Sequence, residues 1–235
     1  MLRFVRAGNA FVLQRFLASR PQTVLDVSSP KVPSLLLAQL GSQVTATDLE
    51  DQAIFDRWKK SADAVGIKNY TAQFQDARKL THPDNSFDFL YSISVIEHIP
   101  DRGDMEALLE FQRVVKPGGT IVVEVPYRRV RKDVFASYDS KGAPLPAPRF
   151  YERYYDRESL HERLEKADNL ELQERWILGE WLPIDPWIEA DRLPRILRLA
   201  ALPLEPFLAA VNGWVRKDDA EGRPLAALLI YRKRA

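Results

Sequence analysis

The sequence predicts a doubly wound α/β fold, in which helices cover both faces of a mostly parallel sheet. Apolar runs of strand length alternate with segments of helical periodicity along most of the chain, which implies parallel strands joined by right-handed crossovers. The runs are almost continuously apolar, as expected for strands covered on both faces. The 235 residues and 46% apolar composition are enough for one sizeable core, and we expect residues 1–235 to form a single domain.

Helical spacing and strand-like runs place the elements of the N-terminal half. Val12 and Phe16 lie four residues apart and predict a first helix over about residues 4–20, clearest over 8–19. Two further helices are expected over 30–40 and 54–65, each closed by a glycine, and Asp104 is expected to cap a fourth. The buried strands between these helices are predicted over 23–27, 44–47, 70–74, 87–93 and 120–125.

The C-terminal third of the chain is less regular. Asp156 is expected to cap a helix over 157–166, and two closing strands are predicted over 170–178 and 225–231. The stretch between them, about 181–222, is rich in proline and is predicted as an insertion between the last two strands. Its leucines and arginines are compatible with a cover for the domain, a homodimer contact, a peripheral membrane contact or a lid over a lipid-like acceptor.

Composition excludes several classes of function. The 34 basic and 33 acidic residues nearly cancel, so we expect no nucleic-acid partner. The sequence has no cysteine, which excludes disulfides and thiolate chemistry, and its three scattered histidines give no metal site. The first 22 residues lack the pattern of a signal peptide, and no uncharged apolar run reaches membrane-spanning length. A cytoplasmic protein is therefore the expectation.

Aspartates stand where three of the predicted strands end: Asp26, Asp48 and Asp76. In an open α/β sheet, ligands bind beyond the carboxyl ends of the strands, where the strand order reverses. Carboxylates there accept hydrogen bonds, so they suit a ligand with a positive centre, ribose hydroxyls and an exocyclic amine. A nicotinamide-dependent oxidoreductase shares this feature, but the G-x-G-x-x-G pattern that it needs after the first strand is absent.

Five segments in order carry a family resemblance: VLDVSSP, VTATDLE, FQDARKL, SFDFLYSISVIEHIPD and VVKPGGTIVVEVP. The stretch 24–126 thus resembles the class I S-adenosylmethionine-dependent methyltransferases, of the type 11 kind. The later segment RFYERYYDRESLHERLEKADNLELQE is similar to the family's substrate-side region. The resemblance implies a Rossmann-like sheet of seven strands with the last one antiparallel, and S-adenosyl-L-methionine as the cofactor.

The resemblance also implies roles for residues around the nucleoside. Asp26 would orient the first loop and lie near the methionine amino group, and Asp48 would hold the ribose hydroxyls. Leu49 would flank the adenine, while Asp76 and the backbone of Ala77 would bind the adenine amine.

The methyl-transfer side is expected at the end of the fourth and fifth strands. The methionine end would pass over Ser92 and Ile93, and Glu97 and His98 would edge the pocket on the acceptor side. The ordinary pKa of histidine suits a general base, so His98 is a candidate catalytic residue, together with Tyr127 directly after the fifth strand. Alternatively, the segment around His98 is a structural loop of this fold.

An aromatic and basic cluster follows the fifth strand. Arg128 and Arg129, together with Tyr151 and Tyr154 further on, could bind an anionic or hydroxylated acceptor through guanidinium forks and phenol hydroxyls. Surface packing of a connector explains the same residues equally well.

The first loop departs from the family pattern, because Ser28-Ser29-Pro30-Lys31 stands where the family is rich in glycine. Serine fills space that glycine leaves open, and Pro30 removes a backbone donor. Ser28, Ser29 and the following helix N-terminus could bind the methionine carboxylate, with Lys31 adding charge. The alternative is a degenerate loop that no longer binds the cofactor.

These observations lead to two hypotheses from different classes. The leading one is an enzyme that transfers a methyl group from S-adenosylmethionine to a small-molecule, glycan-linked or lipid-linked acceptor. The alternative is a non-catalytic binding module that keeps the methyltransferase fold but has a degenerate cofactor loop. Titration with S-adenosylmethionine and S-adenosylhomocysteine separates the two, because only the first predicts binding and thermal stabilisation.

Overall fold

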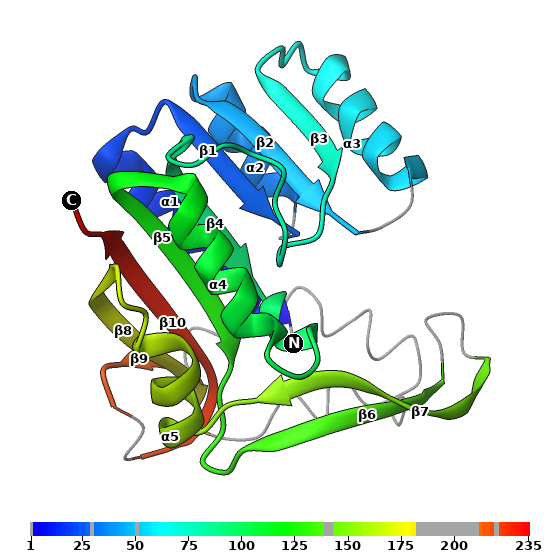
Figure 1. Cartoon of the computed structure of the whole chain (residues 1–235), viewed down its shortest axis with the longest axis vertical. Coiled ribbons are helices and arrows are strands. Elements are labelled where there is room, and N and C mark those ends of the chain that lie inside the picture. Colours follow the sequence, from blue (N-terminus) through cyan, green and yellow to red (C-terminus); the bar gives the residue numbers. More distant parts are fainter. Residues whose placement is uncertain (1, 29–30, 50–51, 139–142, 182–211, 219–220) are drawn as a thin grey trace.

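The central sheet contains eight strands in the order β3-β2-β1-β4-β5-β10-β8-β9 (Figure 1). The computed structural model describes residues 2–28, 31–49, 52–138, 143–181, 212–218 and 221–235. The five strands at one end are parallel. They are β1 (Thr23–Val27), β2 (Gln43–Asp48), β3 (Tyr70–Phe74), β4 (Phe87–Ile93) and β5 (Val115–Pro126). This half confirms the predicted fold class and follows from the apolar runs, since β1 and β4 are buried along nearly their whole length.

The other half of the sheet is antiparallel. The last strand, β10 (Arg223–Lys233), lies between β5 and β8 (Leu170–Glu180) and runs antiparallel to both. The seven predicted strands are therefore present, with the last one antiparallel. A short eighth strand, β9 (Gly213–Arg216), pairs with β8 and comes from the stretch predicted as an insertion. Residues 182–211 of that stretch lie outside the described residues, as do the dimer, membrane and lid interpretations that rest on them.

Helices cover both faces of the sheet. One apolar cluster joins the sheet to α1 (Leu2–Ser19), α2 (Lys31–Gln39) and α3 (Gln52–Ala64). A second cluster joins the opposite face to α4 (Gly103–Val114), α5 (Arg157–Leu160) and the π-helical turn η2 (His161–Glu165). Within the described part of the chain, no helix is both long and apolar enough to cross a membrane.

Two aspartates that the sequence marks as helix caps have different places. Asp156 is the cap of α5, where its carboxylate accepts a hydrogen bond from the backbone N–H of Ser159 at 3.0 Å. Asp104 is not the cap of α4, because Arg102 occupies that position. Asp104 lies inside the first turn, fully buried, and accepts hydrogen bonds from three side chains: Tyr155, Arg153 and Arg163.

A hairpin that the sequence analysis did not predict projects from the sheet (Figure 1). It consists of β6 (Lys132–Tyr138) and β7 (Pro144–Tyr154), which form a separate two-stranded sheet. Most of its residues are exposed or half-buried, so it lacks the buried runs that mark the other strands. Its base joins the main body where the N–H of Arg128 donates to the Tyr155 carbonyl at 2.7 Å.

Candidate functional site

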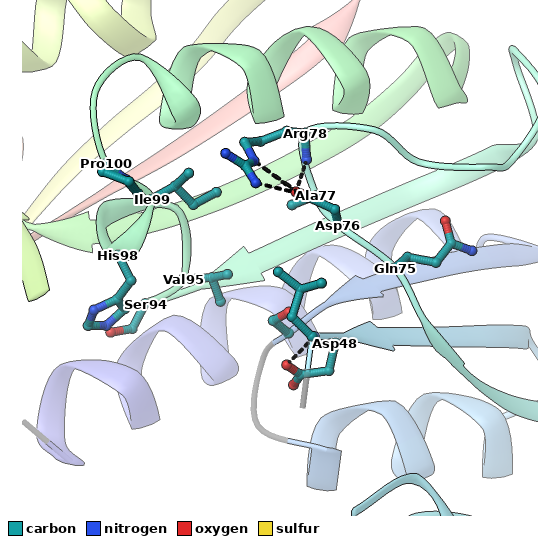
Figure 2. Close-up of a pocket in the computed structure, with 12 residues that line it drawn as sticks. Asp48, Gln75, Asp76, Ala77, Arg78, Ser94, Val95, His98, Ile99 and Pro100 are labelled. Atoms are coloured by element: carbon teal, nitrogen blue, oxygen red, sulfur yellow. Dashed lines mark hydrogen bonds and ion pairs between the residues drawn. The ribbon is translucent and has the colours of Figure 1, made fainter. Parts of the chain in front are cut away.

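A cavity of about 420 Å³ lies where the strand order reverses, between β1 and β4. This is the position at which open α/β sheets bind ligands, and the volume is within the range of small-molecule sites. The lining comes from the loops that follow four parallel strands (Figure 2). It consists of Ser28, Asp48, Leu49, Gln75, Asp76, Ala77, Arg78, Ser94, Val95, His98, Ile99 and Pro100.

Asp48 and Leu49, both predicted to bind the nucleoside, form one side of the cavity. Asp48 ends β2 and is half-buried, and its Oδ1 accepts the backbone N–H of Leu49 at 2.8 Å. Leu49 is exposed, with 54% of its surface accessible. The carboxylate can accept hydrogen bonds from hydroxyl groups, and the apolar side chain beside it can pack against one face of a flat ring.

The loop after β3 forms a second side. Asp76 and the buried Ala77, which are predicted to bind the adenine amine, line the cavity here. Arg78, which is not among the predicted site residues, also lines the cavity. It donates hydrogen bonds to the Asp76 carboxylate from Nε at 3.0 Å and from Nη2 at 2.7 Å. Hydrogen bonds from Arg78 hold the pKa of Asp76 below its usual range. The carboxylate is therefore an acceptor of fixed orientation.

Asp26 is not part of the lining. Its side chain is fully buried and accepts a hydrogen bond from the Ser34 hydroxyl on α2, which also lies 3.1 Å from the Tyr91 hydroxyl. Burial, with the charge of Asp26 as a second cause, raises the pKa of Tyr91 well above its usual range. Asp26 thus ties α2 to the sheet behind the cavity, and its proposed contact with a methionine amino group stays a prediction.

The first loop holds Ser28 in a left-handed conformation, with φ at +53°. Glycine adopts this region without cost, whereas serine does so under strain. The N–H of Ser28 donates to the Thr47 carbonyl at 2.8 Å, which joins the first loop to β2. Ser29 and the side chain of Lys31 lie outside the described residues, so their predicted part in binding a carboxylate stays a prediction.

The loop after β4 closes the opposite end of the cavity from Gln75, as Figure 2 shows for Ser94 and His98. The sequence predicts Ser92 and Ile93 at this position. Both are buried in β4 and do not belong to the lining, which begins two residues later with Ser94 and Val95. The buried strand runs through Ile93, and the role of Ser92 and Ile93 beneath the methionine end of the cofactor stays a prediction.

His98 has a defined orientation in this loop. Its Nδ1 lies 2.6 Å from the backbone carbonyl of Tyr151 on β7, and the two rings make a T-shaped contact at 5.1 Å. A carbonyl only accepts hydrogen bonds, so Nδ1 carries the proton and the neutral ring keeps its lone pair on Nε2. Nε2 lies 3.7 Å from Oε1 of Glu97, which is completely buried. His98 can therefore accept a proton at a known atom.

The remaining predicted acceptor residues lie away from the lining. Tyr127 is 1% exposed and packs in the apolar core, which gives a catalytic role no support. Arg128 donates to the Leu225 carbonyl at 2.5 Å and stacks over the Tyr154 ring at 4.8 Å. Arg129 donates to the carbonyl of Gly222 at 2.9 Å. These contacts favour the packing alternative for the cluster.

Several cavity residues were missed by sequence reasoning. Gln75, Arg78, Ser94, Val95, Ile99 and Pro100 all lie within three residues of a predicted position. The signal that could have found them is the strand end itself, since every loop residue directly beyond it faces the same edge of the sheet. Among the residues that the structure describes, no group of acidic or histidine side chains could hold a metal ion.

Comparison with known proteins finds similarity over the parallel half of the sheet. Residues 25–123 match the family model described as "Methyltransferase domain". A 2-methyl-6-phytyl-1,4-hydroquinone methyltransferase from Synechocystis sp. is 36% identical over 105 residues, which cover 43% of this chain and 31% of that protein. The alignment therefore spans about a third of the length of this curated relative.

Two further comparisons cover more of the chain. The uncharacterized protein YafE of Escherichia coli is 28% identical over 203 residues, which are 86% of this chain and 82% of that protein. The crystal structure of 1,6-didemethyltoxoflavin-N1-methyltransferase from Burkholderia thailandensis superposes with a TM-score of 0.61 at 16% identity, covering 98% of this chain and 78% of that one. At this level of identity the likeness concerns the fold.

Proposed function

We propose that this protein transfers a methyl group from S-adenosylmethionine to a small-molecule acceptor, because residues 25–123 match the methyltransferase domain model and a curated methyltransferase is 36% identical over 105 residues. The observation that carries the proposal is the cavity at the strand-order reversal, lined by the carboxylates of Asp48 and Asp76. The acceptor would enter past His98, at the end of the cavity away from Gln75 (Figure 2).

The lining fits the cofactor group by group. Asp48 offers oxygens to the ribose hydroxyls, and Leu49 offers an accessible apolar surface to the adenine. Asp76, held by Arg78, and the backbone of Ala77 offer hydrogen bonds to the edge of the base. When bound, the cofactor supplies an electrophilic methyl group on a positively charged sulfur.

The protein's own residues then have to position the acceptor and take its proton. His98 accepts the proton at Nε2, because Nδ1 is committed to the Tyr151 carbonyl. The imidazolium that forms lies 3.7 Å from the Glu97 carboxyl, which can stabilise it. Alignment of acceptor and methyl group in a confined cavity supplies much of the remaining acceleration.

The names of curated relatives support a small organic acceptor. They include the hydroquinone methyltransferase above and a ubiquinone/menaquinone biosynthesis C-methyltransferase from Rickettsia akari. A glycan-linked or lipid-linked acceptor remains a hypothesis, as do a peripheral membrane contact and a homodimer.

One observation favours the second candidate function, a binding module without catalysis. Ser28 stands in a left-handed position of the first loop, where its side chain occupies space that a glycine would leave to the ligand. If this loop excludes the cofactor, the fold would serve only to present a surface.

Calorimetric titration with S-adenosylhomocysteine tests the proposed function. We expect the wild-type protein to bind, and Asp48→Asn to bind about 10- to 100-fold more weakly, since a hydrogen bond to a charged group contributes about 1.5–3 kcal/mol. Asp168→Asn is the matched control, because Asp168 is exposed and lies outside the lining. Absence of heat and of thermal stabilisation with either form of the cofactor would favour the binding module.

A further inference from the structure

Two carboxyl groups are buried behind the acceptor end of the cavity. Glu124 on β5 is 0% exposed, and neither of its oxygens has a hydrogen-bond partner among the described residues. Glu97 in the turn η1 (Ile96–His98) is also 0% exposed. Its Oε1 accepts the Ser94 hydroxyl at 2.7 Å, but its Oε2 has no partner in the described chain. Three buried carboxyl oxygens are therefore left without donors.

Such groups are costly unless something binds them. A buried polar atom without a hydrogen bond loses its hydration and gains nothing in return. Burial raises the pKa of Glu97 to about 7. Burial, with repulsion from Glu97, raises the pKa of Glu124 well above its usual range. By contrast, the equally buried Asp104 is held by two arginines and a tyrosine. The pair thus lacks the compensation that the fold provides elsewhere.

A glycine on α1 provides the space that the Glu124 carboxyl occupies. Gly8 on α1 lies so close that a Cβ atom there would overlap the Glu124 carboxyl. The next residue, Asn9, has a buried Oδ1 that also lacks a partner among the described residues. Only glycine at position 8 allows the carboxyl to occupy its present place.

The pair is connected to the cavity through its lining. Ser94 and His98 both line the cavity, and Figure 2 shows them at the same end. Ser94 donates its hydroxyl to Glu97 and its backbone N–H to the carbonyl of Glu124 at 3.0 Å. His98 Nε2 lies 3.7 Å from Glu97. Ser94 therefore lies between the cavity and the two buried carboxyl groups, since it lines the first and hydrogen-bonds to both residues of the second.

We propose that Glu97 and Glu124 form an ammonium-binding subsite at the acceptor end of the cavity, an inference that rests on the proposed function. A primary ammonium has three N–H donors and a positive charge, which match three unpartnered oxygens on two carboxyl groups. A neutral hydroxyl offers one donor and no positive charge, so it does not favour the ionised carboxyl groups in the way that an ammonium does. Two sources offer this group: the amino group of the cofactor's methionine and an amine of the acceptor.

Ammonium binding at this subsite must release protons. A cation beside the pair favours the ionised carboxyl groups, so the protons that burial retains on them leave when the ligand binds. The other titratable groups of the described chain that interact with Glu97 are His98 in the same turn, Tyr151 and Glu152 on β7, and Tyr155 just beyond it. Affinity for the ammonium should therefore rise as the pH increases through 7, as long as the amine stays protonated.

Calorimetry on the full chain with four probes tests the subsite. 5′-Methylthioadenosine carries the nucleoside and sulfur without the amino acid, and S-adenosylhomocysteine adds the amino group. 2-Phenylethylamine and 2-phenylethanol, each added to protein saturated with S-adenosylhomocysteine, differ only in an ammonium and a hydroxyl. The variants are Glu97→Gln and Glu124→Gln, with the exposed Glu171→Gln as the matched control. Buffers of different ionisation enthalpy report the protons released.

If the cofactor supplies the ammonium, Glu124→Gln reduces the preference for S-adenosylhomocysteine over 5′-methylthioadenosine about tenfold or more and abolishes proton release. If the acceptor supplies the ammonium, Glu124→Gln leaves the preference for S-adenosylhomocysteine unchanged. The variant then no longer binds 2-phenylethylamine, whereas 2-phenylethanol binds neither the wild-type protein nor the variant. Equal binding and equal proton release in all variants would overturn the subsite. Failure of both 5′-methylthioadenosine and S-adenosylhomocysteine to bind the wild-type protein would instead refute the proposed function.

Discussion

Asp104 anchors the base of the β6–β7 hairpin to α4, and an Asp104→Asn variant measures what this anchor contributes. The buried carboxylate accepts hydrogen bonds from Tyr155 at 2.6 Å and from Nη2 of Arg163 at 2.6 Å. It also pairs with Arg153, whose side chain is 3% exposed. The asparagine keeps the shape but removes the charge, so a buried guanidinium loses its main counterion.

The magnitude follows from that burial. Removing one partner of a buried ion pair costs about 3–5 kcal/mol. Arg153 keeps a second contact, to Asp133 at 3.2 Å, so we expect the lower end, about 3 kcal/mol. In a chain of this size each kcal/mol corresponds to about 2–4 °C, so the melting temperature should fall by about 6–12 °C.

Urea and thermal unfolding followed by circular dichroism provide the measurement, with Asp84→Asn as the control. Asp84 pairs with Arg113 at 2.8 Å, but its side chain is 70% exposed, so its loss should cost about 0–1 kcal/mol. If Asp104→Asn lay within about 1 kcal/mol of the wild type at an unchanged m-value, the anchor would contribute no more than a surface pair.

Three further outcomes follow from the structure. Ser28→Gly should stabilise the protein by up to about 1 kcal/mol, because it relieves the left-handed strain at φ +53°; an unchanged unfolding midpoint would mean that the serine is not strained. His98→Asn should lower kcat by about 10²–10⁴-fold while the affinity for S-adenosylhomocysteine stays the same, and an equal loss of affinity would instead place His98 in cofactor binding. Burial raises the pKa of Glu97 to about 7 in the folded protein, above its value in the unfolded chain. Protonation of Glu97 therefore stabilises the fold at low pH. This contribution to the free energy of unfolding is lost as the pH rises from about 4.5 to 7. Stability of Glu97→Gln should vary less over that range, and parallel pH profiles for variant and wild type would contradict this.

The parallel half of the fold could be predicted because burial on both faces leaves a plain mark in the sequence. The runs at 23–27 and 87–93 are apolar enough to be recognised as strands without further information. The β6–β7 hairpin could not be predicted in this way, since most of its residues are exposed or half-buried and its second strand contains prolines. Strand β9 is only 4 residues long and pairs at the sheet edge.

The candidate site was predictable to the extent that strand ends determine it. Asp48 and Asp76 line the cavity because Asp48 ends β2 and Asp76 lies two residues beyond the end of β3. Asp26 lies near the end of β1, but its side chain is fully buried, accepts a hydrogen bond from Ser34 on α2 and is not part of the lining. Glu124 could have been identified from the sequence as a candidate site residue. It is a lone charge inside the apolar run of β5, and a buried charge needs a partner or a ligand.

A crystal structure of the complex with S-adenosylhomocysteine tests the central claim most directly. We predict electron density for the nucleoside in the cavity, with the ribose hydroxyls on Asp48, the adenine against Leu49, and its amine at Asp76 and Ala77. Crystals grown with a saturating excess of this ligand that show the cavity filled by the Ser28 loop, or the nucleoside bound elsewhere, would contradict the account.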